Sequence, residues 1–511
     1  MSVNLHCRPF LKLATIVMAL TTSVTCSSPN SPLHADDWPQ FRGPNSSGTS
    51  TGTGSLPLKF SATENVRWSQ PAGDGIGCAV AAAGRVFVSG MTAPQQVTLA
   101  AFDINSGKVL WKRQWDTGPL PEVHQTNSHA SSTPAADEHR VHFYFSTLGL
   151  LTLDAATGAD LWKQELPVPF FVFKWGAGMS PVFCGDLVVF CQDDDLNPAL
   201  YAFDRATGTL RWKDDRSDMA VNYSHPIVNT IDGRSEIVVA GTGLLIGYDP
   251  QTGQRRWYAR TLLRNIKTTP VCRDGVIYLS VQSGGIANQW LVAVDQAETG
   301  NRDGRIDRQE TQAYLGNTPV PEAFFTRTFG RGDKNGDGFL EGQELDLAFL
   351  HPNNFAGATF TSTGESAAEE FVLAVRGGGS GDVTSSHLLW KHATRHTDHI
   401  VSPFLLEDRL LLIKSGGICT TRNLQTGELQ DWPRRIGNAG IYFASPIAAD
   451  GKIFLAAENG TVTVLEHSNQ FPQLADNDAG ESIIATPSVH RGQLLLRTRT
   501  QLLCISLSRP L

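Results

Sequence analysis

The amino-acid sequence predicts an all-β protein: an eight-bladed β-propeller whose first and last strands share one sheet, with a small α-helical insertion in the fifth blade. Three observations support this prediction. A hairpin phrase recurs along the chain, a proline-containing phrase recurs beside it at a nearly constant spacing, and one interval is much longer than the others. Repeats of about 40–50 residues are typical of four-stranded propeller blades.

The first phrase is a strand that ends in an acidic residue, a turn with Thr-Gly or Ser-Gly, and a strand that reaches a tryptophan. The carboxylate can accept N–H groups of the turn, and the glycine can adopt a positive φ. We expect each tryptophan to pack between neighbouring blades. The copies run from Asp103 to Trp111, Asp154 to Trp162, Asp204 to Trp212 and Asp249 to Trp257, with a weaker copy from Asn423 to Trp432.

In the second phrase, Ser or Thr followed by Pro precedes a short apolar strand. Proline has no N–H to donate, so we expect each such strand at a free sheet edge, innermost in its blade and lining the central channel. The prolines are residues 134, 181, 226, 270, 403, 446 and 487, and His225 replaces Ser or Thr before Pro226. The gap between Pro270 and Pro403 is far longer than the others and marks an insertion.

The two ends of the chain are predicted to share a sheet. The last unit lacks a Trp strand, whereas Trp68 ends a strand that has no unit before it. Joining them closes the ring and leaves no open sheet edge between the first and last blades. Eight blades follow, with seven as the alternative. The second strands are expected to start near Val86, Val141, Leu187, Ile237, Val276, Leu410, Ile453 and Leu494.

The N-terminus indicates export. Residues 1–35 look like a signal peptide and leader, since Arg8 and Lys12 precede an apolar run, Leu13–Leu20, that is too short for a stable membrane anchor. We therefore expect a periplasmic or extracellular protein, with a lipid anchor at Cys26 as the less favoured alternative. The net charge of −8 and the lack of a basic run argue against nucleic acid as a partner.

Residues 333–344 match the EF-hand calcium loop, D-x-[DN]-x-[DN]-G-x5-E, at every position. Ca²⁺ prefers oxygen ligands, and this spacing places them in one tight loop. Leu340 is expected to form a short β-bridge with a partner loop. The expected ligands are Asp333, Asn335, Asp337, the carbonyl of Phe339, Glu341 through water, and both carboxylate oxygens of Glu344.

Residues 299–310 form the partner loop, in which Thr299 replaces the first aspartate. We expect this loop to pair with its neighbour and to bind calcium weakly or not at all, with Asn301, Asp303 and Glu310 as candidate ligands. The expected organisation of the chain is the leader at 1–35, blades one to four and the start of blade five at 36–295, the insertion at 296–370, and the rest of the propeller at 371–511.

The recurring Asp-x-x-Thr-Gly-x-x-x-Trp phrase resembles the quinoprotein-type, or PQQ-like, propeller repeats. Residues 37–45, 176–182, 222–226 and 377–384 resemble a secreted bacterial branch of that family. The resemblance implies an eight-bladed propeller, and family position implies that Lys174, Trp175 and Asn222 face the channel. It also implies two contrasting functions. Quinoprotein dehydrogenases hold pyrroloquinoline quinone (PQQ) and a metal, whereas members that resemble the outer-membrane assembly propeller bind protein segments.

The first functional hypothesis is a non-enzymatic scaffold that binds an unidentified protein or peptide, with calcium held by the insertion. Association with the cell envelope is an open alternative for its setting. No catalytic residues are predicted, and the Asp193–Asp195 run is interpreted as a solvated loop. The alternative hypothesis is a PQQ-dependent alcohol or sugar oxidoreductase. The adjacent cysteine pair typical of that group is absent from the sequence.

Overall fold

The computed structural model describes Met1 and residues 35–507, apart from 53, 220, 242, 261–266, 284–285, 349–368 and 395–399. The expected leader, residues 1–35, therefore lies outside the described residues except at its two ends. Eight sheets form the blades of one propeller, so the prediction of eight rather than seven is confirmed. No helix in the described part of the chain combines the length and apolar character needed to cross a membrane.

In blades one to four the strands follow one another from the innermost to the outermost position. Blade one contains β2 (Val80–Ala82), β3 (Arg85–Ala93), β4 (Gln96–Asp103) and β5 (Val109–Asp116); blade two contains β6 (Ala135–Ala136), β7 (Arg140–Phe145), β8 (Gly149–Asp154) and β9 (Asp160–Gln164); blade three contains β10 (Val182–Cys184), β11 (Leu187–Gln192), β12 (Ala199–Asp204) and β13 (Leu210–Asp215); blade four contains β14 (Ile227–Ile231), β15 (Arg234–Ala240), β16 (Leu244–Tyr248) and β17 (Arg255–Arg260).

Blade eight is completed by the N-terminal strand β1, which pairs antiparallel with β33 as predicted. Blade five contains β18 (Val271–Arg273), β19 (Val276–Ser283), β20 (Glu369–Arg376) and β22 (Leu388–Ala393); blade six contains β23 (Phe404–Leu406), β24 (Arg409–Lys414), β25 (Ile418–Asn423) and β26 (Leu429–Arg435); blade seven contains β27 (Ile447–Ala449), β28 (Lys452–Ala456), β29 (Thr461–Glu466) and β30 (Gln473–Asp478); blade eight contains β31 (Ser488–His490), β32 (Gln493–Arg497), β33 (Gln501–Ser506) and β1 (Val66–Pro71).

The recurring Asp-to-Trp phrase forms a joint between blades. Trp111 of blade one donates its indole N–H to the carbonyl of Ala155 in blade two, over 3.1 Å. A side chain at Gly158 of that turn would clash with the Trp111 ring, so the glycine is required there for close approach. Trp68, Trp162, Trp212 and Trp390 repeat this contact with the next blade. The prediction that the tryptophans pack between blades is confirmed for these residues.

The innermost strands are joined by serine and threonine hydroxyl groups. Ser402 donates its backbone N–H to the hydroxyl of Ser445 in the next blade, over 3.1 Å. The same bond joins Cys78 to Thr133, Thr133 to Ser180, Thr269 to Ser402, and Ser445 to Thr486. Because the following strands lie at sheet edges, the predicted role of the prolines is confirmed. His225 interrupts the series, since it has no hydroxyl to offer Ser180.

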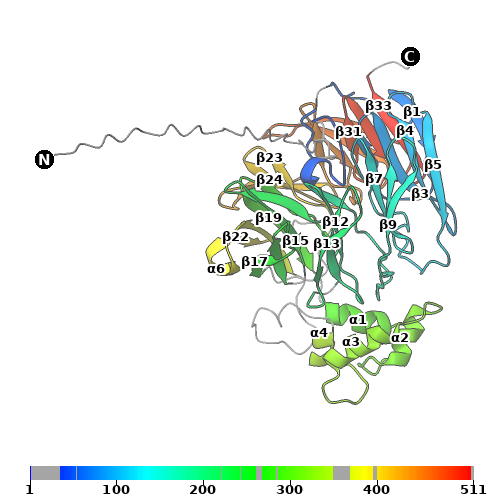
Figure 1. Cartoon of the computed structure of the whole chain (residues 1–511), viewed down its shortest axis with the longest axis vertical. Coiled ribbons are helices and arrows are strands. Elements are labelled where there is room, and N and C mark those ends of the chain that lie inside the picture. Colours follow the sequence, from blue (N-terminus) through cyan, green and yellow to red (C-terminus); the bar gives the residue numbers. More distant parts are fainter. Residues whose placement is uncertain are drawn as a thin grey trace.

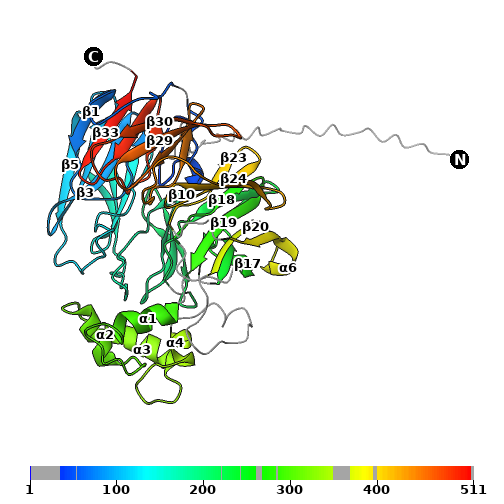
Figure 2. The ribbon, with the colours of Figure 1, turned by 180° about the vertical axis from the view of Figure 1, so that it is seen from behind.

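The insertion lies between β19 and β20 of blade five. Figures 1 and 2 show its helices together on one side of the propeller, far from β33. Trp290 and Val294 of the first helix share a core with the other helices, so we assign that helix to the insertion together with 296–370. The described helices here are α1 (Ile286–Val294), α2 (Arg308–Leu315), α3 (Glu322–Gly332) and α4 (Gln343–Ala348).

Two short elements lie outside the blades and the insertion. After β20, β21 (Gly381–Asp382) pairs in parallel with β17 and adds a fifth strand to the sheet of blade four. It is followed by the helical turn α6 (Thr384–His387). Near the N-terminus, the 3-10 turn η1 (Pro44–Ser46) lies against β14. The family-like stretches at 377–384 and 37–45 therefore connect elements that are distant in sequence.

Candidate functional site

A cavity of about 320 Å³ occupies the central channel. It is formed where the innermost strands begin and by the loops that precede them. Most of its wall is apolar or aromatic, which suits an apolar group held by a few polar contacts. Its lining includes Phe41, Trp175, Tyr223, His225, Lys267 and Phe443.

The N-terminal segment 37–50 closes the channel at the opposite ends of the innermost strands; we call it the plug. It crosses from blade to blade by hydrogen bonds. Ala136 and Ala448 donate N–H groups to carbonyls of the plug, while Gln40 and Asn45 accept with their side chains. The bonds are Ala136 N to Pro39 O (2.7 Å), Phe183 N to Gln40 Oε1 (2.8 Å), Val228 N to Asn45 Oδ1 (2.8 Å) and Ala448 N to Gly48 O (2.8 Å).

His225 supplies a polar atom at the floor of the cavity. Its ring stacks on Phe41 of the plug, with ring centroids 4.4 Å apart. Burial, assisted by nearby Arg42, lowers the pKa of His225 to about 4, so the imidazole is neutral near pH 7. Within the described part of the chain, its Nε2 atom has no hydrogen-bond partner. A buried polar atom without a partner is unusual and can be satisfied by a bound group.

The mouth of the cavity is formed by Trp175, His124 and Lys267. The His124 and Trp175 rings have centroids 4.5 Å apart, and the Lys267 ammonium lies 4.9 Å from the Trp175 ring. Family position implied that Trp175, Lys174 and Asn222 face the channel. Trp175 lines the cavity, but neither Lys174 nor Asn222 is part of its wall. Asn222 is buried and donates to Asp193, and Lys174 turns to Tyr314 of the insertion.

Residues 170–175, between β9 and β10, connect the mouth to the insertion; we call them the mouth loop. Val172 is fully buried in the core of the insertion. Phe170 contacts Phe324 of α3, and Phe173 contacts Trp290 of α1, each with ring centroids 5.2 Å apart. One loop therefore packs inside the insertion and also carries Trp175 into the cavity.

The Asp193–Asp195 run holds the mouth loop, and its interpretation as a solvated loop was wrong. Asp193 and Asp194 are buried, and Asp193 forms an ion pair with Arg216 over 2.7 Å. Asp194 accepts the N–H of Phe170 over 2.8 Å. Its burial raises the pKa of Asp194 to about 7. The polar sequence suggested solvation because it does not reveal that a distant arginine neutralises the first carboxylate.

The loop 333–344, which the sequence predicts to bind calcium and which we call the calcium loop for that reason, joins α3 to α4. Asp333 accepts N–H groups of Gly336 (2.7 Å) and Gly338 (3.0 Å) with its two oxygens, which draws the loop around that carboxylate. Glu344 accepts the N–H of Lys334 over 3.0 Å. Asn335 and Asp337 are exposed to solvent, where a cation can reach them.

The partner loop lies against the calcium loop. Ile306 and Leu340 exchange two backbone hydrogen bonds of 3.1 and 2.9 Å, so the predicted β-bridge is present. Asn301 and Asp303 are exposed, and Glu310 is buried at the start of α2. Over the described residues, no three His, Cys, Asp or Glu side chains are grouped closely enough to hold a metal as they stand. The carboxylates instead accept backbone N–H groups.

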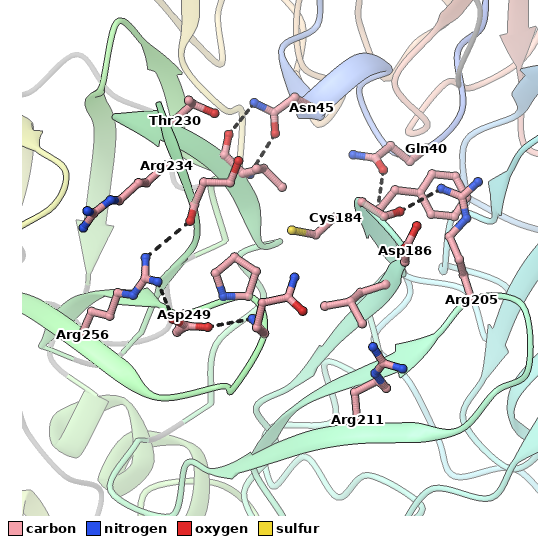
Figure 3. A pocket seen from close by; sticks show the side chains of 17 residues that line it. Gln40, Asn45, Cys184, Asp186, Arg205, Arg211, Thr230, Arg234, Asp249 and Arg256 are labelled. Atoms are coloured by element: carbon pink, nitrogen blue, oxygen red, sulfur yellow. Dashed lines mark hydrogen bonds and ion pairs between the residues drawn. The ribbon is translucent and has the colours of Figure 1, made fainter. Parts of the chain in front are cut away.

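A larger cavity, of about 930 Å³, lies on the plug side between blades three and four, with Gln40 and Asn45 at its edge (Figure 3). Four arginines line it. Three of them form ion pairs, which neutralise most of the positive charge, so we favour the channel cavity as the functional site. The pairs are Arg205 with Asp137, Arg211 with Asp204 and Arg256 with Asp249.

The channel does not fit a metal-bound quinone. None of the described residues that line its cavity is acidic, so the wall offers no carboxylate to hold a metal ion. The described cysteines are all free thiols, and burial raises the pKa of Cys184 to about 11. Phe41, Tyr223, His225 and Lys267 were not predicted as site residues. Phe41, Tyr223 and His225 lie in the family-like stretches 37–45 and 222–226, and His225 also replaces Ser or Thr before Pro226. No sequence pattern indicated Lys267.

Comparison with known proteins gives a family match. The family model described as outer membrane protein assembly factor BamB matches residues 58–171 and 95–325, which together exceed half of the chain. No curated protein matches.

Many solved structures are similar to the chain, and three of them serve as examples. BamB from Moraxella catarrhalis is 14% identical with a TM-score of 0.46, over 85% of this chain and 95% of that one. The computationally designed Ika8 protein is 11% identical with a TM-score of 0.49, over 85% and 98%. Quinohemoprotein alcohol dehydrogenase from Comamonas testosteroni is 12% identical with a TM-score of 0.40, over 93% and 82%.

Proposed function

Because the chain belongs to the PQQ-like β-propeller family described as outer membrane protein assembly factor BamB, we propose that it is a non-enzymatic scaffold that binds a segment of a partner protein in its channel cavity. Calcium bound by the insertion sets the position of the cavity mouth. The observation that carries this proposal is the mouth loop, which packs Val172 in the insertion and presents Trp175 to the cavity.

The cavity suits an apolar side chain at the tip of a protein segment. The plug closes one end, so a segment enters past Trp175 and Lys267 and stops at Phe41 and His225. Burial of an apolar side chain contributes about 1.5–3 kcal/mol. His225 Nε2 can hydrogen-bond to a polar group of the segment.

Calcium has a structural role in this proposal. The carboxylates of Asp333, Asp337 and Glu344 repel one another in a loop that has no cation, and Ca²⁺ offsets that repulsion. A loop held in this way fixes α3 and α4. Because Phe324 of α3 contacts Phe170, the position of α3 affects the position of the mouth loop.

We place this function outside the cytoplasm, at the cell envelope. The support is the expected leader at residues 1–35, together with the words "outer membrane protein assembly" in the description of the family. The partner remains a protein or peptide of the exported fraction.

Site-specific photo-crosslinking tests the proposal. A photoreactive phenylalanine analogue replaces Tyr223 in the cavity, or Leu389 on the outer strand β22 as a matched exposed control. We expect protein adducts from position 223 in calcium, several-fold fewer in a chelator, and none specific to position 389. Equal adducts from both positions, or no adduct from position 223, would contradict the scaffold function.

The alternative, a PQQ-dependent oxidoreductase, makes a different prediction. Purified protein supplied with PQQ and Ca²⁺ would then show quinone absorbance and dye-linked oxidation of simple alcohols or sugars. We expect neither, because none of the cavity-lining residues that the structure describes offers a carboxylate for the metal. Turnover in this assay would replace the scaffold function with the enzymatic one.

A further inference from the structure

Asp295 is a buried carboxylate at the end of α1 that the EF-hand spacing leaves out. Its side chain is 1% exposed. One oxygen, Oδ2, accepts the N–H of Gly304 over 3.2 Å, which directs the carboxylate into the loop 299–310. The other oxygen, Oδ1, is buried and has no hydrogen-bond partner among the described residues. An ionised oxygen in that position is costly unless it meets a cation or a donor.

Asp295 occupies the same structural position as Asp333, the first ligand of the calcium loop. Each donates its backbone N–H to a carbonyl four residues earlier, Asp295 to Leu291 (3.0 Å) and Asp333 to Phe329 (2.8 Å), so each ends its helix. Each also accepts the N–H of the loop glycine through Oδ2, Asp295 from Gly304 and Asp333 from Gly338.

The sequence spacing does not show this equivalence, because the chain forms an additional turn after Asp295. Gly300 donates to Ala297 over 3.2 Å, and Arg302 donates to the carbonyl of Asp295 over 3.2 Å, so the chain returns to its starting point. A Cβ atom at Gly300 would lie 2.0 Å from that carbonyl oxygen, so only glycine allows the return. The motif therefore counts Thr299 as its first residue, whereas Asp295 lies where the first ligand of an EF-hand loop is found.

We propose that residues 295–310 form a second calcium site, an enlarged EF-hand loop whose first ligand is Asp295. The remaining ligands are Asn301, Asp303, the carbonyl of Arg305 and Glu310. Glu310 Oε1 already accepts the N–H of Asn301 over 2.9 Å, which places this carboxylate at the same turn. The site has three carboxylate ligands, whereas the loop 333–344 has three direct ones and Glu341, which is expected to act through water. This inference takes only the identity of the cation, Ca²⁺, from the proposed function.

Affinity differs between the two loops. Arg305 forms an ion pair with Asp303 over 3.3 Å, and its guanidinium also lies 4.2 Å from the Phe339 ring. This positive charge competes with Ca²⁺ for Asp303. The enlarged loop is therefore the weaker of the two sites, and the Ile306–Leu340 bridge joins it to the stronger one.

Calorimetric titration of the full-length protein with Ca²⁺ tests the proposal. We expect two ions per chain, and we expect Asp295→Asn to weaken one site at least tenfold. Thr299→Ala, which changes the residue that the motif places first, leaves both sites unchanged. Asp333→Ala with Glu344→Ala removes the other site and leaves the one at Asp295.

Unchanged binding by Asp295→Asn, or loss of a site in Thr299→Ala, would overturn the inference. So would a single ion that disappears in the Asp333→Ala, Glu344→Ala variant. Because Asp295 is buried, Asp303→Asn serves as a second variant at an exposed ligand and is expected to weaken the same site. The crosslinking result at Tyr223 is independent of this count, so the two proposals fail separately.

Discussion

Trp68 of β1 lies opposite Cys504 of β33 in the sheet of the eighth blade. The first and last strands of the propeller therefore pair directly, and Trp68 extends the joint by donating its indole N–H to Ile104 of blade one over 2.8 Å. This closure removes the free sheet edges that a ring of blades would otherwise expose. It also fixes the channel in which the plug and the cavity lie.

The Trp–Gly contact between blades can be tested at Gly107. A Cβ atom there would lie 2.6 Å from the Trp68 ring, whereas one at Gly84 would meet nothing within 4 Å, and both glycines have positive φ. Both alanine variants place a Cβ atom on a left-handed backbone, which lowers stability, but only Gly107→Ala adds a clash. We expect Gly107→Ala to lower the free energy of unfolding by about 1–3 kcal/mol more than Gly84→Ala in urea titrations. Equal losses would show that the contact contributes little.

The series of hydroxyl hydrogen bonds between innermost strands predicts that Ser445→Ala lowers the free energy of unfolding. The substitution leaves the buried N–H of Ser402 without its acceptor, which costs about 1–3 kcal/mol. Ser132→Ala is the control, because the Ser132 hydroxyl is buried and has no partner among the described residues. Urea unfolding should separate the two variants, and indistinguishable midpoints would argue against the series as a stabilising feature.

The raised pKa of Asp194 predicts that the free energy of unfolding depends on pH. Burial raises its folded pKa to about 7, so between about pH 4 and pH 7 the folded state binds more protons than the unfolded state. Its contribution to the free energy of unfolding therefore falls as pH rises through this window, by up to about 4 kcal/mol. Asp194→Asn should lack this decline when both proteins are unfolded in urea at each pH. Parallel profiles would mean that Asp194 titrates normally.

Calcium is expected to raise thermal stability. A ligand that binds only the folded state at 100 times its Kd adds about 2.7 kcal/mol. The melting temperature of the wild type should rise with added Ca²⁺ and fall back with chelator. Asp333→Ala with Glu344→Ala should lose most of the rise, whereas Glu341→Gln, at a ligand expected to act through water, should keep most of it. A rise of equal size in the double variant would contradict the assignment of the loop.

The repeat made the fold predictable, because each copy carries its own physical reason. The glycine of each turn allows the tryptophan of the preceding blade to approach, and the proline marks the sheet edge. Seven prolines mark seven innermost strands, so the count of eight blades comes from the second strands and from the joined ends of the chain. Trp257 departs from the rule. It donates to Glu236 within its own blade, because the next blade has Gly377 and Gly378 where the others have the Asp-to-Gly turn.

The functional site was only partly predictable, since it depends on contacts between distant segments. The plug was recognised only as a family-like stretch, and nothing in its residues indicates that Gln40 and Asn45 bond to blades three and four. Asp295 lies outside the EF-hand spacing, which assumes that the chain takes the shortest path between ligands. Periodic patterns reveal regular packing, whereas loops that return on themselves need coordinates.

Calcium binding to the insertion is proposed to order the cavity mouth, and the mouth loop transmits this effect. Hydrogen–deuterium exchange with and without Ca²⁺ measures this at the amides of residues 170–179. We predict that Ca²⁺ slows exchange both there and in 333–344 in the wild type, and that both effects vanish in Asp333→Ala with Glu344→Ala. Slower exchange confined to the insertion, with residues 170–179 unchanged, would contradict the claim.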